Sequence, residues 1–245
     1  MIQGLIARTI RNEHVNPYDY LQLNALNYVL NTCLGTEVET KFSRERREAV
    51  LGPLIQEAIK SDRDNMIKHM HQHQSGTGIE DIDLTIAASD MITAGTDTVT
   101  AAGYWFIAIL LHHPTVCKKI SDEVDAFIKE HGRLPLPYER DSLPYFIAVQ
   151  KECLRYRPFI FLGIPHELQK DVQVQNYLFP RGVPIYPLLY AMHQNPDRYP
   201  EPDKFIPERF LGKTDTAAAA GKIEDRDIFL FGFGRRACLG VHASR

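Results

Sequence analysis

The stretch Phe231-Gly-Phe-Gly-Arg-Arg-Ala-Cys-Leu-Gly240 decides how the rest of the chain is interpreted. It places Cys238 among three glycines and two arginines, directly after the apolar run Ile228-Phe-Leu230. Because glycine has no Cβ, the backbone of this loop can approach a flat cofactor closely. A helix beginning near Cys238 would point free N–H groups at the sulfur and favour the thiolate, the form that binds metals. The loop therefore predicts a metal-binding cysteine beside a flat ligand, whose carboxylates Arg235 and Arg236 could neutralise.

Two other interpretations of the loop are open on its residues alone. A lone cysteine in an apolar setting is usually a buried free thiol. Gly232-x-Gly234-x-x-Ala237 after a strand-like run also fits the dinucleotide-binding fingerprint, which needs a helix, a second strand and an acidic residue further on. The sequence ends at Arg245 and leaves no room for them, so we expect no nicotinamide site here.

The loop resembles the haem-binding loop of the cytochrome P-450 family, of the eukaryotic microsomal type and compatible with a fungal origin. Every fixed position of that loop is filled, by Phe231, Gly234, Arg236, Cys238 and Gly240. The resemblance implies that Cys238 is the axial thiolate of a haem b iron, a ligand that favours O–O cleavage. It implies that the other four residues belong to the cofactor-binding site.

The segment from Glu80 to His112 predicts one long helix, which ends there because a proline, Pro114, disfavours helix for the residue before it. Its middle, Thr93-Ala-Gly-Thr-Asp-Thr-Val-Thr100, is poor in helix-forming residues. The glycine alone costs about 1 kcal/mol relative to alanine. A threonine hydroxyl there can bond the carbonyl four residues back and bend the helix. Such a break in composition within a helix indicates a site.

Two interpretations of that middle segment remain. One is a groove of small residues for close helix packing. The other is a resemblance to the oxygen-binding helix of the cytochromes P-450, in which Gly95 is the small residue near the cofactor. That resemblance implies that Asp97 and Thr98 act in catalysis, by helping to deliver protons during oxygen activation.

The segment Ser142 to Tyr156 predicts a helix on which Glu152 and Arg155, three residues apart, are neighbours. This pair coincides with the Glu-x-x-Arg pair of the family, and Pro207-Glu-Arg-Phe210 coincides with the segment that supplies its third member, Arg209. The resemblance implies a buried network of the three side chains that supports the haem loop. We expect its role to be in folding and not in catalysis.

The region 170–210 predicts a small sheet followed by an irregular meander. Val172 and Val174 alternate with polar residues, and Pro180-Arg-Gly182 forms a turn. Frequent prolines exclude long regular elements after it. His166, just before this region, aligns by resemblance with a position that contacts a haem propionate; a surface loop histidine is the alternative.

The first part of the chain predicts two amphipathic helices, one ending at Gly35 after a break near Asn16-Pro17 and one following the basic run from Lys41 to Arg47. Three histidines follow at alternate positions, His69, His71 and His73. Neutral imidazoles four residues apart can share a metal. No acidic or cysteine partner is close in sequence, so a polar helix end is the alternative.

Composition limits the classes of function. The 245 residues carry a net charge of −3 and 44% hydrophobic residues, which gives no case for nucleic-acid binding. The apolar run Ala101–Leu111 is too short to cross a bilayer, and no signal peptide or anchor is recognisable at the start. We therefore expect a soluble chain. The four widely spaced cysteines suit a reducing compartment.

Together the patterns predict a mainly α fold with a small β-sheet, similar to the later part of a cytochrome P-450 domain and incomplete as such. Its expected parts are the oxygen-binding helix at 80–112, the Glu-x-x-Arg helix at 142–156, the sheet and meander at 170–210 and the haem-thiolate loop at 231–240. The interval between Gly35 and Arg44 is too short for the helices that cover the substrate in the family.

The resemblance implies a haem-dependent monooxygenase that inserts one atom of molecular oxygen into an apolar small-molecule substrate. Electrons would come from NADPH through a separate reductase, and full-length relatives sit on the cytoplasmic side of the endoplasmic reticulum membrane. The alternative is a non-catalytic fragment of such an enzyme, with weak or no haem binding. In the family, substrate specificity is determined largely by segments that we do not recognise in this sequence.

Overall fold

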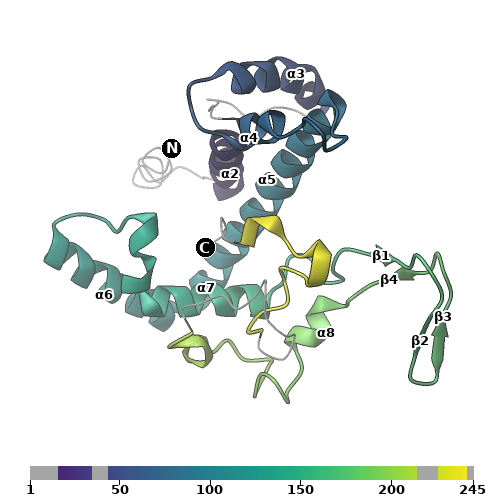
Figure 1. The fold of residues 1–245 in the computed structure, drawn as a ribbon. Coiled ribbons are helices and arrows are strands. Elements are labelled where there is room, and N and C mark those ends of the chain that lie inside the picture. Colours follow the sequence, from purple (N-terminus) through teal and green to yellow (C-terminus); the bar gives the residue numbers. More distant parts are fainter. Residues whose placement is uncertain (1–15, 35–43, 214–225, 242–245) are drawn as a thin grey trace. The chain divides into compact units, whose positions relative to one another are not determined.

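The computed structural model describes residues 16–34, 44–213 and 226–241 (Figure 1). This part of the chain is mainly helical and contains two short antiparallel ladders of two strands each, which confirms the predicted fold class. The sequence predicts one small sheet, whereas the strands pair as two separate ladders. The chain divides into two compact units, Met1–Tyr104 (unit 1) and Trp105–Arg245 (unit 2).

Unit 1 is built from helices. They are α2 (Pro17–Leu34), α3 (Arg44–Lys60), α4 (Met66–Gln72) and the greater part of α5 (Asp81–Leu111). The end of α2 and the start of α3 fall within a few residues of the predicted positions. Asn65 begins α4 by accepting a hydrogen bond from the Lys68 N–H at 2.9 Å, as an N-cap residue does.

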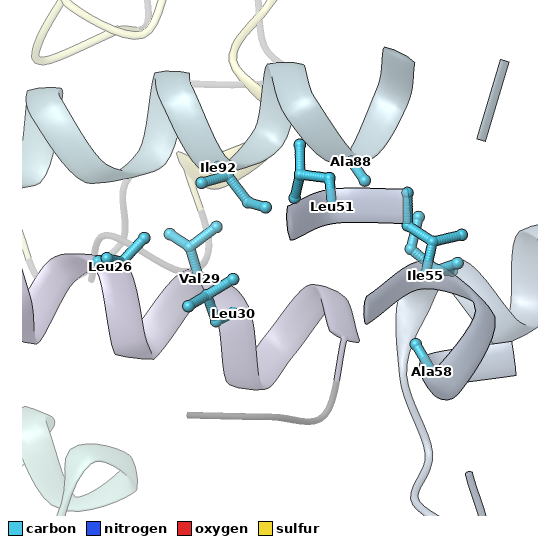
Figure 2. Packing of buried hydrophobic residues seen from close by; sticks show 9 residues of the cluster. Leu26, Val29, Leu30, Leu51, Ile55, Ala58, Ala88 and Ile92 are labelled. Carbon is cyan, nitrogen blue, oxygen red and sulfur yellow. The ribbon is translucent and has the colours of Figure 1, made fainter. Parts of the chain in front are cut away.

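The core of unit 1 lies where α2, α3 and α5 meet, and Ile67 of α4 belongs to the same cluster. Figure 2 shows its side chains pointing toward one another from the three helices: Leu26, Val29 and Leu30 of α2, Leu51, Ile55 and Ala58 of α3, Ala88 and Ile92 of α5. On each helix they recur every three or four residues, which is one face of an α-helix. Burial of this face, and not helix propensity, is what stabilises helices of this length.

Gly95 of α5 lies against Val29 of α2. A Cβ built on Gly95 would come within 2.5 Å of the Val29 Cγ2 atom, much closer than carbon atoms approach. The glycine therefore permits the close approach of the two helices. This contact is the small-residue packing that the sequence left open, and it accounts for a glycine in the middle of a long helix.

One helix of the described chain, α5, is long and apolar enough to cross a membrane by length and composition alone. The sequence argument considered only residues 101–111, which are a third of this helix. Leu84, Ala88 and Ile92 are buried along one face of α5 in unit 1, as in the core helix of a globular domain.

Unit 2 begins with the end of α5 and continues through short elements. Its helices are α6 (Pro114–His131), η1 (Pro137–Ser142), α7 (Pro144–Tyr156), α8 (Leu189–His193), η2 (Pro207–Phe210), η4 (Gly234–Arg236) and η5 (Leu239–Val241), where η denotes a 3₁₀ helix. Its strands are β1 (His166–Glu167), β2 (Val172–Val174), β3 (Tyr177–Phe179) and β4 (Pro184–Ile185).

Proline and glycine set the helix ends of unit 2. Pro114 occupies the first turn of α6, and Gly132 ends it in the left-handed conformation with φ of 68°. Pro144 likewise starts α7, two residues after the predicted start. Glu123 of α6 then accepts the N–H groups of Tyr145 and Phe146 at 2.8 Å each, so α6 caps the first turn of α7.

The two ladders are antiparallel. In β2 and β3 Val172 pairs with Phe179 and Val174 with Tyr177. In the other ladder His166 of β1 pairs with Ile185 of β4. Along the chain β1 precedes β2 and β3, and β4 follows them, so the β1–β4 ladder encloses the β2–β3 ladder in sequence.

We expect the Gly95→Ala substitution to destabilise the chain by about 1 kcal/mol. Alanine gains about 1 kcal/mol of helix propensity, but overpacking against Val29 costs about 1–3 kcal/mol. Urea unfolding followed by circular dichroism measures the difference. Gly103→Ala is the matched control, since its Cβ would meet the mobile end of Leu21, the Cδ2 atom, at 3.2 Å. In a Val29→Ala background Gly95→Ala should be neutral or stabilising; stabilisation by Gly95→Ala in the wild-type chain would contradict the packing argument.

Candidate functional site

The most deeply buried charges of unit 2 surround the Glu152 carboxylate on α7. Its Oε2 atom accepts from Arg155 Nε at 2.7 Å, and its Oε1 atom accepts from Arg155 Nη2 at 2.8 Å. Oε1 also accepts the Ile206 N–H at 2.8 Å and Arg209 Nε at 3.2 Å. The Glu152 and Arg155 side chains are both 0% exposed. The structure therefore brings together the three residues that the resemblance placed in one network.

The same arginines bind the backbone of the irregular segment after α8. Arg155 donates to the carbonyls of His193, Pro202 and Lys204 at 2.9–3.0 Å. Arg209 donates to the Pro200 carbonyl at 2.9 Å. The network thus holds residues 193–209 against α7 by hydrogen bonds from charged donors, the stronger kind.

A second set of contacts fixes residues 226–229, which lead into the loop. The buried Lys151 ammonium pairs with Asp227 Oδ2 at 2.5 Å. The Tyr199 hydroxyl donates to the Asp227 carbonyl at 2.7 Å. His193 Nε2 accepts the Phe229 N–H at 3.0 Å. Each of these partners comes from α7 or from the segment that the network holds.

The loop itself, drawn in yellow in Figure 1, is held in its turned conformation by hydrogen bonds to its own backbone. The Gly232 N–H donates to the Phe229 carbonyl at 3.0 Å, and the Cys238 N–H donates to the Phe231 carbonyl at 2.8 Å. Arg226 also donates to the Gly232 carbonyl. Gly232 and Gly234 have φ values of 66° and 64°, which glycine adopts without strain. Phe231, Gly234, Arg236, Cys238 and Gly240 therefore share one short, tightly turned segment.

Cys238 is an exposed thiol, so the interpretation as a buried free cysteine is wrong. Among the cysteines whose side chains the structure describes, Cys153 is buried, and burial, followed by the charge of Glu152, raises the pKa of its thiol. A Cβ on Gly234 would meet open space, and a Cβ on Gly240 would lie 3.6 Å from the Cys238 sulfur. An accessible soft ligand with little bulk around it leaves room for the face of a flat metal complex.

The surroundings of the Cys238 sulfur differ from the prediction that a helix begins near this residue. The helix that would begin after Cys238 is, within the described residues, the 3₁₀ helix η5 of three residues. Arg235 and Arg236 are exposed and form no ion pair within the part of unit 2 that the structure describes. Residues 228–230 form no strand, so the first strand of a dinucleotide-binding fingerprint is absent there.

The residues singled out on α5 lie in unit 1, and the loop lies in unit 2. The Thr98 hydroxyl donates to the Ala94 carbonyl at 2.5 Å, the bond to the preceding turn that its sequence position predicts. Asp97 is exposed, and Gly95 contacts Val29. Within unit 1 the structure thus brings Gly95, Asp97 and Thr98 onto one turn of α5.

His166 is half-buried in β1, and no hydrogen bond or ion pair joins it to the loop within the described residues. The three histidines near α4 do not converge on one point. His69 Nε2 lies 2.5 Å from Asp64 Oδ1, so the expectation that no acidic partner is close in sequence is wrong. His73 Nδ1 lies 2.8 Å from the His69 carbonyl oxygen. No group of three potential metal ligands occurs in the part of the chain that the structure describes.

Sequence reasoning missed Lys151 and His193. Lys151 had a detectable signal, because it lies four residues from both Ile147 and Arg155 and so shares the inward face of α7. His193 follows the apolar residues of α8, and nothing in its local sequence distinguishes it from a surface histidine.

Comparison with known proteins places the chain in a family. The family description Cytochrome P450 matches residues 36–244. A cytochrome P450 monooxygenase of Gibberella fujikuroi is 37% identical over 157 residues, which are 63% of this chain and 28% of that protein. Cytochrome P450 monooxygenase claT of Ampulloclitocybe clavipes is 40% identical over 155 residues, 63% of this chain and 31% of that protein.

A mammalian relative matches a longer part of the chain. The steroid 17-alpha-hydroxylase/17,20 lyase of Mesocricetus auratus is 30% identical over 220 residues, 90% of this chain and 40% of that protein. The chain belongs to the cytochrome P450 family, as the resemblance predicted. It spans between 28% and 42% of the length of the curated relatives it matches.

We expect the Glu152→Gln substitution to cost about 3–5 kcal/mol of unfolding free energy, because it leaves the buried Arg155 charge without a counter-charge. Denaturant unfolding followed by circular dichroism measures this loss. Asp122→Asn in the exposed Lys118–Asp122 pair is the control and should change the unfolding free energy little, because solvent screens this pair. Equal effects of the two substitutions would contradict the burial argument.

The pH dependence of stability should report on His193. Burial, and then the charges of Arg155 and Arg198, lower the pKa of His193 to about 3. The unfolded chain protonates this ring near its ordinary pKa of 6.5, so the folded state loses stability as the pH falls from 6.5 toward 3. Between pH 6.5 and 5 the loss is about 2 kcal/mol.

The pH range from 6.5 to 5 distinguishes the contribution of His193 to stability from that of the carboxylates. Lys119 lowers the pKa of Glu208, whose contribution is lost only below its ordinary value of 4.5. Unfolding free energies of the wild type and of His193→Gln, measured at intervals from pH 5 to 7, should converge toward pH 5. Parallel curves would show that the ring is not held neutral.

Proposed function

We propose that this chain is the haem-binding part of a haem-thiolate monooxygenase, with Cys238 as the axial ligand of haem b. The observation that carries the proposal is an exposed cysteine on a glycine loop in a chain of the cytochrome P450 family. Dioxygen as co-substrate, electrons from NADPH through a separate reductase and an apolar small-molecule substrate belong to the same proposal. The endoplasmic reticulum membrane is the location that we propose for the full-length protein.

The loop residues have separate roles in this proposal. Bound haem would supply the activation of dioxygen, which no side chain can perform alone. Phe231 and the glycines Gly234 and Gly240 leave room for its face beside the sulfur. Arg236 would neutralise a carboxylate of the haem as a charged donor, and His166 from β1 would contact a propionate.

On α5 we assign proton handling to Asp97 and Thr98, with Gly95 as the small residue beside them. The Thr98 hydroxyl donates its hydrogen bond to the Ala94 carbonyl, so the lone pairs of the hydroxyl oxygen can still accept a proton or a hydrogen bond from water. The exposed Asp97 carboxylate, on the same turn, can exchange protons with solvent. The pair would pass protons toward the reacting oxygen while the cofactor carries the redox chemistry.

Cys238→Ala should abolish the thiolate-linked haem spectrum, because it removes the proposed ligand. The chain is purified with haem, reduced and exposed to carbon monoxide, and the absorption band that marks thiolate ligation is recorded. Cys117→Ala is the matched control, since Cys117 is the other exposed cysteine of the described chain and should leave the band unchanged. An unaltered band in Cys238→Ala would overturn the proposal. A wild-type chain that retains no haem would favour the alternative of a non-catalytic chain.

A further inference from the structure

The Glu152, Arg155 and Arg209 network does not touch the cysteine loop directly. Their hydrogen bonds end on one another and on the backbone of residues 193–206. None of these bonds reaches residues 226–241, the described part of the chain that contains the loop. If the network supports the loop, the support has to pass through another residue.

His193 is in the position to provide that link. Its backbone carbonyl accepts Arg155 Nη1 at 3.0 Å, and its ring Nε2 accepts the Phe229 N–H at 3.0 Å. It is 0% exposed and lies among aromatic rings, with ring centroids 6.2 Å from Tyr199 and 5.8 Å from Phe229. One residue thus binds the network through its backbone and the approach to the loop through its side chain.

The bond to Phe229 fixes the form of the ring. Since Nε2 accepts a hydrogen bond, it carries no proton, and the neutral ring carries its proton on Nδ1. Burial and the neighbouring guanidinium groups lower the pKa of His193, so the ring keeps this acceptor at neutral pH. Without an acceptor there, the Phe229 N–H would be buried and unpaired, which is costly.

From Phe229 the restraint continues to the sulfur in two short steps. The Phe229 carbonyl accepts the Gly232 N–H at 3.0 Å, which closes the first turn of the loop. The Phe231 carbonyl, inside that turn, accepts the Cys238 N–H at 2.8 Å. The position of Phe229 therefore sets the position of the backbone that holds Cys238.

We propose that His193 is a positioning residue that couples the Glu152–Arg155–Arg209 network to the cysteine loop, and that through Phe229 it holds Cys238 in place. The coupling concerns the polypeptide alone. Its consequence for haem ligation rests on the function proposed above. Lys151 of α7 and the Tyr199 hydroxyl hold Asp227 by separate contacts, so they give the loop two attachments that do not pass through His193.

The coupling is tested on the full chain without haem. His193→Phe keeps the ring and removes the acceptor, whereas His193→Gln restores an acceptor at nearly the same reach. Leu189→Ala is the control for stability, since Leu189 is buried in the same helix and belongs to the core cluster that includes Ile228 and Phe229, but its side chain cannot accept a hydrogen bond from the loop. Hydrogen exchange of the peptide 226–241, measured by mass spectrometry, reports the opening of the loop.

His193→Phe should speed exchange of this peptide about tenfold relative to Leu189→Ala compared at equal global stability, since it orphans a buried N–H. His193→Gln should return exchange to near the wild-type rate. The alkylation rate of Cys238 should change in parallel, with Cys117 of the same molecule as the internal reference. Equal exchange in His193→Phe and Leu189→Ala, or no recovery in His193→Gln, would overturn the proposal.

A double-mutant comparison tests the coupling itself. Glu152→Gln should speed loop exchange more in the wild-type background than in the His193→Phe background, because there the link through His193 is already cut and only the contact of Tyr199 with Asp227 still joins the held segment to the loop. An equal effect of Glu152→Gln in both backgrounds would show that the network reaches the loop by another route, and would overturn the proposal.

Haem reconstitution separates this inference from the proposed function. In a chain that takes up haem, His193→Phe should lower the fraction of the carbon-monoxide complex that shows the thiolate band, and His193→Gln should restore it. An unchanged fraction would contradict the role in holding Cys238. If the wild-type chain takes up no haem, the proposed function fails, and the exchange and alkylation data still decide the coupling.

Discussion

The fold of unit 2 depends on the full burial of the Glu152 carboxylate. An ionised carboxylate with no access to water is tolerated only when charges and N–H groups surround it. Arg155 lies on the same helix, but Arg209 and the Ile206 N–H come from a segment more than fifty residues further along the chain. That segment has no regular secondary structure long enough to stabilise itself. Its path is set by its contacts with the buried charges: it donates hydrogen bonds to Glu152, and its backbone carbonyls accept hydrogen bonds from the two arginines.

The cysteine loop depends in turn on this segment. Two 3₁₀ helices of three residues each are its only regular elements within the described residues, so its internal hydrogen bonds are few. Contacts from α7 and from residues 193–199 supply the remainder, at Asp227 and Phe229. A rigid loop around an exposed sulfur is thus obtained by attachment to a buried network and not by secondary structure. Preorganisation of this kind is what a metal ligand needs.

The sequence predicted those features that follow from local chemistry. Pro114, Gly132 and Pro144 set helix ends, because proline and glycine restrict the backbone wherever they occur. The spacing of the residues around Cys238 indicated the family because it, too, is contained in one short stretch of sequence. Lys151 and His193 escaped prediction because their partners lie 76 and 36 residues away, and a lysine or histidine is usually exposed. Periodicity likewise could not reveal that Gly95 faces Val29, since the neighbour of a helix face is set by tertiary packing.

The chemistry of position 193 explains why a histidine stands there. The Phe229 N–H requires an acceptor, and the rings of Tyr199 and Phe229 require an apolar surface beside it. A carboxylate would accept the bond but would compete with Glu152 for Arg155, and a phenylalanine would fill the space but leave the N–H unpaired. A neutral imidazole satisfies both requirements, although its buried Nδ1 atom has no hydrogen-bond partner within the described residues. The charge of Arg155 and that of Arg198, whose guanidinium carbon lies 4.7 Å from the Phe229 ring centre, oppose protonation of the ring. Burial is the largest cause of the lowered pKa of His193, and the charge of Arg155, which binds the meander, also helps to preserve the acceptor that holds the loop.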